Sequence, residues 1–160
     1  MEADTDESTN ARGFNFVVLN AGDLTYRGKE RFDTYAGEQG NVGESGRMAA
    51  WLRSLDGGLI VLGAVRDDGA RRLTADARLA MKEVLGAQLV EALAKGESYA
   101  VAGVVGAAAP LAEEKKPVGT AVAVARGGVT CPAALVSADD KTYYSYAAQM
   151  SYAAYQAANP

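Results

Sequence analysis

Histidine is absent from this chain of 160 residues, and cysteine occurs only once. The absence of histidine excludes Ser-His-Asp and Cys-His catalysis, histidine-ligated zinc and histidine-based pH switching. The single cysteine, Cys131, excludes an internal disulfide. The sequence also lacks the P-loop, EF-hand, G-x-S-x-G and S-x-x-K patterns. We therefore expect a non-enzymatic chain with no catalytic residues, no metal site and no cofactor.

A long apolar run and an excess of basic residues are missing as well. The apolar, uncharged stretch of residues 98–112 is shorter than the ~20 residues of a membrane helix and contains glycine and proline. The sequence therefore predicts a chain that does not itself span a membrane. The formal net charge is −4, and the basic residues are scattered, which argues against a nucleic-acid partner. The acidic start shows no signal peptide, so the compartment stays unassigned.

The hydrophobic fraction of 49% and the charged fraction of 22% are ordinary for one globular domain. Apolar alternation predicts a strand over 13–20, and the more polar 24–32 predicts its hairpin partner. The nearly continuous apolar run 59–65 is typical of a central strand buried on both faces. Two later strands are predicted over 99–105 and 118–125, and the segment between them, with its charged tip, is predicted to be a loop.

Two amphipathic helices are predicted between these strands. The first begins near Ser45, a plausible N-cap, and its apolar face consists of Met48, Trp51, Leu52 and Leu55. The second begins after Thr74 and ends at Gly86. A short third helix is possible over 88–94. The sequence thus predicts an α+β fold, with mixed or antiparallel sheets flanked by two to three short helices.

Several segments, in this order and spacing, carry a family resemblance. They are residues 12–20 (RGFNFVVLN), 31–35 (RFDTY), 56–62 (DGGLIVL), 67–69 (DDG), 73–78 (LTADAR) and 85–86 (LG). Together they resemble the interleukin-like EMT inducer domain of the PANDER-like proteins. That domain also occurs in large hyaluronan-related cell-surface proteins and in the stem of protein O-mannose N-acetylglucosaminyltransferase. The resemblance covers about residues 12–106.

The resemblance implies a compact fold of two sheets flanked by short helices, and a secreted or lumenal binding module. In the transferase stem it implies a lectin-like site for a β-linked N-acetylglucosamine. The position of an arginine that is typical of the family is occupied here by Gly96. We expect three parts: an acidic, disordered tail over 1–11, the family domain over 12–136, and a Tyr/Ala-rich helical tail over 137–160.

The candidate ligand-binding residues come from the family-like stretches and the turns. They are Asp33, Tyr35, Asp67, Glu97 and Tyr99. Residues that follow strands or lie in turns frequently bind ligands. The alternative is that Asp33 bonds local backbone and that residues 67–69 simply make a turn.

The last residues are unusually rich in tyrosine, which together with methionine is enriched in protein interfaces. The candidate docking residues are Tyr143, Tyr144, Tyr146, Met150, Tyr152 and Tyr155. A helix here could pack on its own domain or dock to another subunit. Two functions therefore stay open: a module that binds a glycan, or an accessory subunit of a larger, membrane-associated or organellar assembly that binds other protein subunits.

Overall fold

The computed structural model describes residues 8–35, 43–120, 123–129, 141–146 and 149–150. A five-stranded sheet has the order β2-β1-β3-β4-β5, and a three-stranded sheet has the order β6-β7-β8. The strands are β1 Gly13–Asn20, β2 Tyr26–Phe32, β3 Leu59–Arg66, β4 Ser98–Val104, β5 Ala112–Lys116, β6 Val124–Val129, β7 Lys141–Tyr146 and β8 Gln149–Met150. The helices are α1 Gly43–Arg53, α2 Ala75–Leu85 and the 3₁₀ turn η1 Leu89–Ala92.

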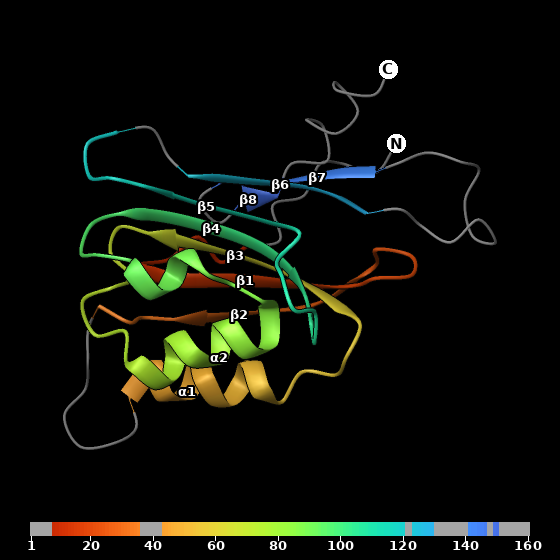
Figure 1. Cartoon of the computed structure of the whole chain (residues 1–160), viewed down its shortest axis with the longest axis horizontal. Coiled ribbons are helices and arrows are strands. Elements are labelled where there is room, and N and C mark those ends of the chain that lie inside the picture. The colour runs from red at the N-terminus through yellow and green to blue at the C-terminus, as the bar shows by residue number, and fades with distance from the viewer. Residues whose placement is uncertain (1–7, 36–42, 121–122, 130–140, 147–148, 151–160) are drawn as a thin grey trace.

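Every strand pair in the described part of the chain is antiparallel. The expected α+β class is therefore confirmed. Figure 1 shows α1 and α2 on one side of the five-stranded sheet and the smaller sheet on the other. The smaller sheet approaches the larger one through β7, which contacts β3 and β4, and through β6, which contacts β4 and β5.

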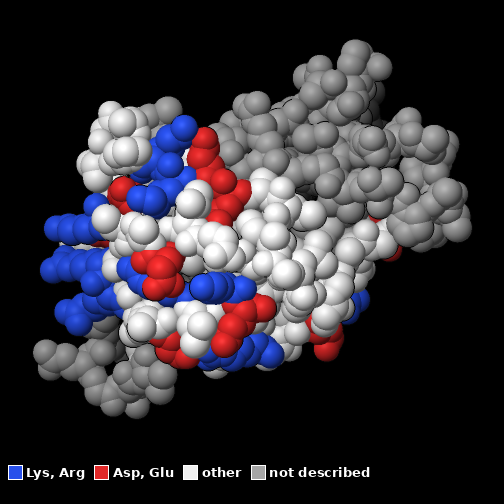
Figure 2. All heavy atoms as spheres, in the orientation of Figure 1, with Lys and Arg blue, Asp and Glu red and all other residues white. Residues whose placement is uncertain are grey.

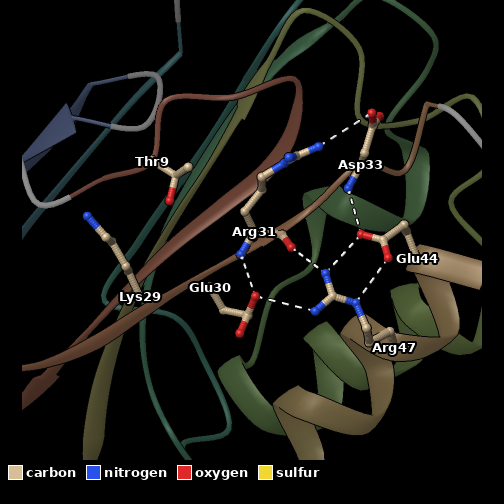
Figure 3. A pocket seen from close by; sticks show the side chains of 7 residues that line it. All are labelled: Thr9, Lys29, Glu30, Arg31, Asp33, Glu44 and Arg47. Carbon is tan, nitrogen blue, oxygen red and sulfur yellow. Dashed lines mark hydrogen bonds and ion pairs between the residues drawn. The ribbon is translucent and has the colours of Figure 1, made fainter.

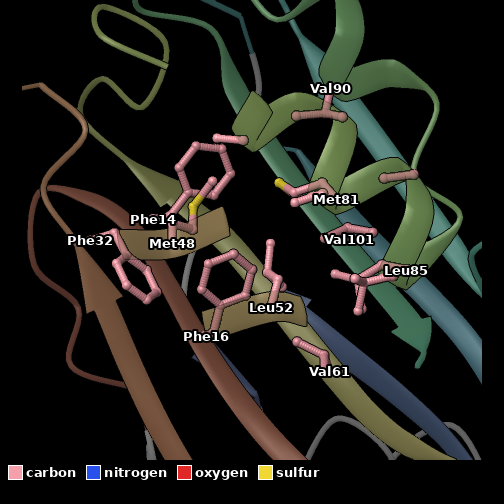
Figure 4. Close-up of a cluster of buried hydrophobic side chains, with 14 of the residues drawn as sticks. Phe14, Phe16, Phe32, Met48, Leu52, Val61, Met81, Leu85, Val90 and Val101 are labelled. Carbon is pink, nitrogen blue, oxygen red and sulfur yellow. The ribbon is translucent and has the colours of Figure 1, made fainter. Parts of the chain in front are cut away.

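One face of the five-stranded sheet and the two helices enclose the main core (Figure 4). Aromatic rings dominate it: the Phe16 ring stacks on Phe14 at 5.8 Å and lies 5.2 Å from the Trp51 ring. The expected apolar stripe of α1 is confirmed for Met48 and Leu52, which are fully buried, and for Trp51, which packs against the core. Leu55 also packs against the core, but α1 ends at Arg53, so Leu55 lies beyond the helix. The other members of this core are Val18, Phe32, Ala49, Val61, Val65, Leu73, Ala77, Ala80, Met81, Val84, Leu85, Ala87, Val90, Leu93, Tyr99 and Val101.

The other face of the sheet carries smaller side chains. It consists of Val17, Leu19, Ile60, Leu62 and Ala102, with Ala64 and Ala100 packed against Ala123. Successive side chains of a strand point to opposite faces, so a strand buried on both sides reads as an unbroken apolar run. This is why β1 and β3 carry the least interrupted apolar sequences in the chain.

The caps of α2 are as the sequence predicts. The Thr74 hydroxyl accepts a hydrogen bond from the Ala77 N–H, and Gly86 ends the helix at φ 69°. The cap predicted for α1 is wrong: the helix already begins at Gly43, and the buried Ser45 hydroxyl instead accepts from the Thr74 N–H at 2.9 Å. Ser45 therefore ties the start of α2 to α1.

Three other predictions are corrected by the structure. The predicted loop 107–117 contains β5, and the strand predicted over 118–125 begins only at Val124. The C-terminal helix is wrong where the structure describes it, because residues 141–146 and 149–150 are strands. Adjacent tyrosines and a threonine favour extended backbone, and β6 provides a partner strand. Residues 151–160 lie outside the described part.

A single turn, η1, is held from both ends by charged side chains. Glu113 accepts hydrogen bonds from the N–H groups of Gln88 at 2.8 Å and Leu89 at 2.9 Å. At the other end, the Arg78 guanidinium donates to the carbonyls of Val90, Glu91 and Leu93. The expected third helix therefore exists as a 3₁₀ turn with a carboxylate at its N-terminus and a guanidinium at its C-terminus.

Candidate functional site

Three segments meet at one end of the five-stranded sheet. Phe14 on β1 lies opposite both Phe32 on β2 and Val65 on β3, so the start of β1 and the ends of β2 and β3 are neighbours. Two loops are cross-linked there: the Thr34 hydroxyl donates to the Gly69 carbonyl at 2.7 Å, and the Arg72 N–H donates to the Thr34 carbonyl at 2.9 Å. These bonds give the loops a fixed geometry.

Arg12 is the centre of the cluster that these loops hold. Its Nη2 lies 2.8 Å from Asp33 Oδ2, and its Nε lies 3.1 Å from Oδ1, which is a bidentate ion pair. The guanidinium carbons of Arg12 and Arg71 lie 4.5 Å and 4.6 Å from the centroid of the Tyr35 ring. The hydrogen bonds that Arg12 donates to Asp33 raise the pKa of Arg12, and the nearby charge of Asp67 acts in the same direction.

The structure thus brings together three of the candidates chosen from the sequence: Asp33, Tyr35 and Asp67. We call these residues, with Arg12 and Arg71, the polar end. Asp67 has a left-handed backbone at φ 65°, a conformation that is uncommon outside glycine and is frequent at functional sites.

The neighbouring Asp68 stabilises the backbone of the loop that follows β3. It is buried, and its Oδ1 accepts from the N–H groups of Ala70 at 2.9 Å and Arg71 at 3.2 Å. Asp68 therefore stabilises the loop after β3, in line with the structural interpretation of residues 67–69.

Glu97 and Tyr99 do not join the polar end. Glu97 forms an ion pair of 2.8 Å with Lys115 on β5, and this hydrogen bond lowers the pKa of Glu97. Tyr99 is fully buried, and its hydroxyl donates to Glu113 at 2.6 Å. Tyr99 therefore belongs to the hydrophobic core and does not face a ligand. Gly96 has φ 75°, so an arginine there would be strained.

The tyrosines of the C-terminal segment lie on strands as far as the structure describes them. Tyr143, Tyr144 and Tyr146 belong to β7, and Met150 belongs to β8. Tyr152 and Tyr155 lie outside the described residues. Because β7 pairs with β6 and contacts β3 and β4, this strand has a partner within its own chain.

A pocket of about 560 Å³ opens beside the polar end (Figure 3). It is lined by Thr9, Lys29, Glu30, Arg31, Asp33, Glu44 and Arg47. Glu44 accepts a hydrogen bond from Arg47 at 2.9 Å, which is the main reason that its pKa is lowered, and a second from the Asp33 N–H at 3.1 Å. Arg47 also donates to the Arg31 carbonyl at 2.7 Å. This network joins α1 to the end of β2.

Sequence reasoning missed the arginines of this region. Arg12 and Arg31 lie in segments that identify the family resemblance, but neither was predicted to bind a ligand. A usable signal was present in β2, because Lys29 and Arg31 are two residues apart and so lie on the same face of a strand. Figure 2 shows basic side chains projecting together on one side of a chain whose net charge is negative.

The family model of the interleukin-like EMT inducer matches residues 12–107, a range that contains the whole polar end. The chain belongs to the interleukin-like EMT inducer family. It is also similar to the human cell surface hyaluronidase CEMIP2, with 35% identity over 101 residues. The matched region is 63% of this chain and only 7% of that relative. The family resemblance inferred from the sequence is thus confirmed.

The description of the matched family, an interleukin-like inducer, indicates a cytokine-like module. Among the described residues, no group of three or more Cys, Asp or Glu side chains could hold a metal ion. Within the same ranges, no helix has the length and apolar character needed to cross a membrane.

Proposed function

We propose that this chain is a non-catalytic binding module that recognises a carbohydrate at the polar end of the sheet. The observation that carries the proposal is the bidentate pair of Arg12 and Asp33 beside the Tyr35 ring. Saccharides offer hydroxyl groups that need fixed donors and acceptors, and apolar ring faces that pack on aromatic side chains. Planar guanidinium and carboxylate groups provide such donors and acceptors with defined geometry.

Binding is a better interpretation than catalysis for this cluster. Both oxygens of Asp33 are engaged by Arg12, and Arg31 approaches Oδ2 to 3.6 Å. A carboxylate with both oxygens bonded to an arginine has a fixed orientation, which suits ligand binding. A general acid or base must instead exchange a proton with the substrate, and these bonds oppose protonation of Asp33. The similar human protein is named as a hyaluronidase, and hyaluronan is a polysaccharide, which favours a saccharide ligand, although the matched region is a small part of that protein.

The alternative is an accessory subunit that uses the fold as a docking platform for other proteins. This interpretation relied on a free, tyrosine-rich C-terminal helix. The described part of that segment is instead strand, and it is paired within the chain. The carbohydrate hypothesis is therefore the one that the geometry favours.

The test is a saccharide array followed by NMR titration of the full chain. Replacing Tyr35 with alanine should lower the affinity for any bound saccharide at least about tenfold, because aromatic contacts and the flanking guanidinium positions are lost together. Tyr26→Ala is the matched control, since Tyr26 is exposed at the start of β2 and far along the strand from the polar end. Absence of saccharide binding, or equal affinity in the Tyr35→Ala variant, would overturn the proposal.

A further inference from the structure

Edge strand β2 presents two basic residues on the sheet face that points away from the helices. Lys29 lies opposite Val17, and Arg31 lies opposite Asn15, whereas the intervening Glu30 pairs with Phe16 of the main core. Cross-strand neighbours share a face, so Lys29 and Arg31 stand side by side, roughly 7 Å apart along the strand. Both line the pocket beside the polar end (Figure 3).

These two cations differ from the other cations of the pocket in their hydrogen bonding. Arg47 is paired with Glu44 and Glu30. The Nε atom of Arg31, in contrast, is buried and has no acceptor among the described residues. The Lys29 ammonium is exposed and forms no ion pair with any described carboxylate. A buried donor without an acceptor is costly, so the unused donors favour an acceptor that comes from a ligand.

The local charge favours an anion at this position. Three cations and three carboxylates line the pocket: Lys29, Arg31 and Arg47 against Glu30, Asp33 and Glu44. The carboxylates are already bonded, Asp33 to Arg12, which lies outside the lining, and Glu44 to Arg47. Arg31 also approaches Asp33, at 3.6 Å. The Lys29 ammonium, which has no ion pair with a described carboxylate, and the Nε donor of Arg31 therefore leave unused positive charge on β2.

We propose that Lys29 and Arg31 bind the acidic group, a carboxylate or sulfate, of an anionic polysaccharide. This inference rests on the proposed function and names the class of saccharide. The pocket volume of about 560 Å³ is in the range of small-ligand sites and accommodates one or two sugar units. The acidic group occupies the space between the two basic side chains, and the adjoining sugar lies toward Tyr35. Two basic side chains do not make the long basic stripe that a nucleic-acid backbone requires.

The experiment compares four probes by calorimetry on the full chain: a hyaluronan hexasaccharide, its carboxyl-reduced form, a heparin hexasaccharide and neutral chitohexaose. We expect the acidic probes to bind at least about tenfold more tightly than the neutral ones, and we expect their affinity to fall as salt is added. Preference for hyaluronan over heparin would assign the site to carboxylate, and the reverse preference would assign it to sulfate. Either preference supports the inference.

Variants separate this site from general charge effects. Lys29→Gln and Arg31→Gln should each remove most of the preference for acidic probes. Arg27→Gln is the matched control, because it removes the same charge from the same strand but does not line the pocket. Arg31→Lys keeps the charge and loses the Nε donor, so it should recover only part of the affinity. Circular dichroism melting of each variant confirms that the fold is retained.

The outcomes distinguish the two proposals. If no saccharide binds, the proposed function fails and this inference fails with it. If acidic and neutral probes bind equally and Lys29→Gln has no effect, this inference is overturned while the proposed function stands. A single-stranded oligonucleotide is measured in the same way as a fifth probe, and tighter binding of it than of any saccharide would overturn the inference in favour of a phosphate backbone.

Discussion

The two faces of the five-stranded sheet are both buried, but they are covered by different means. The helix-covered face presents large rings, with Phe14, Phe16 and Phe32 fully or almost fully buried beneath α1 and α2. The other face presents Val17, Ile60 and other smaller side chains, and it is covered by a sheet that comes later in the chain. One face is completed by residues close in sequence, and the other depends on a distant segment.

This difference shows how one strand can serve two cores. In β1, Phe14 and Phe16 face the helices while Asn15 and Val17 face the smaller sheet. On the helix side, Gly63 of β3 leaves room for the Phe16 ring, since a Cβ atom there would lie only 2.6 Å from Phe16 Cε1. The helix side is therefore closely interlocked, and the opposite side is a flatter aliphatic surface.

Removing the cover of the flatter face should have the largest effect. Deleting residues 141–160 removes β7 and β8 and exposes aliphatic side chains that β7 covers on β3 and β4. Several newly exposed aliphatic residues at about 1.5 kcal/mol each should lower the melting temperature by about 10 °C or more. Calorimetry checks this expectation. An unchanged melting temperature with loss of a co-purifying partner would instead restore the docking interpretation of the segment.

The next prediction compares the loss of unfolding free energy caused by truncating one side chain on each face of the sheet. Phe16→Ala should lower the free energy of unfolding by about 3–5 kcal/mol, because it removes a ring that contacts Phe14, Phe32 and Trp51. Val17→Ala, the neighbouring position on the other face, should cost only about 1–2 kcal/mol since less surface is lost. Urea denaturation of both variants measures the difference. Equal losses would show that the two faces contribute alike.

A further small effect, similar in size to that of Val17→Ala, concerns the buried hydroxyl on the helix face. Tyr99→Phe should cost about 1–2 kcal/mol at neutral pH, because Glu113 loses one donor but keeps its backbone donors. Burial raises the pKa of Tyr99 well above its usual range. Its stabilising contribution is thus present below the unfolded-state pKa of about 10 and is lost as the pH rises through the folded-state value.

The measurement is urea denaturation of the wild type and Tyr99→Phe at neutral pH and above about pH 10. The difference between the two proteins should narrow in the alkaline series. A difference that stays constant with pH would show that the ionisation of Tyr99 is not linked to folding.

Most of the fold could be predicted from the sequence because its signals are local. The apolar run of β3, the Thr74 cap and the glycine at the end of α2 depend on neighbouring residues alone. The C-terminal strands could not be predicted in this way. Residues 141–146 combine tyrosine, threonine and serine, which tolerate either helix or strand, and pairing with β6 decides between them.

The candidate site was predicted only in part, because some of its residues have local sequence signals and others depend on distant partners. Asp33, Tyr35 and Asp67 were found because they follow strands whose ends meet at one edge. Tyr99 looked equivalent in the sequence, but alternation along β4 turns its side chain into the core. Arg12 was missed as a site residue because its importance comes from a partner 21 residues away, Asp33.

The charged side chains at the two ends of η1 have a consequence for amide hydrogen exchange. An isolated single turn opens constantly and exchanges its amide protons almost as fast as an unfolded peptide. In this chain, the amides of Leu89 and Val90 donate to Glu113, which is anchored on β5, and the carbonyls beyond them accept from Arg78 on α2. Opening the turn therefore requires a sheet strand or a helix to give way. We therefore expect the amides of Leu89 and Val90 to exchange about as slowly as those of the larger elements that hold the turn.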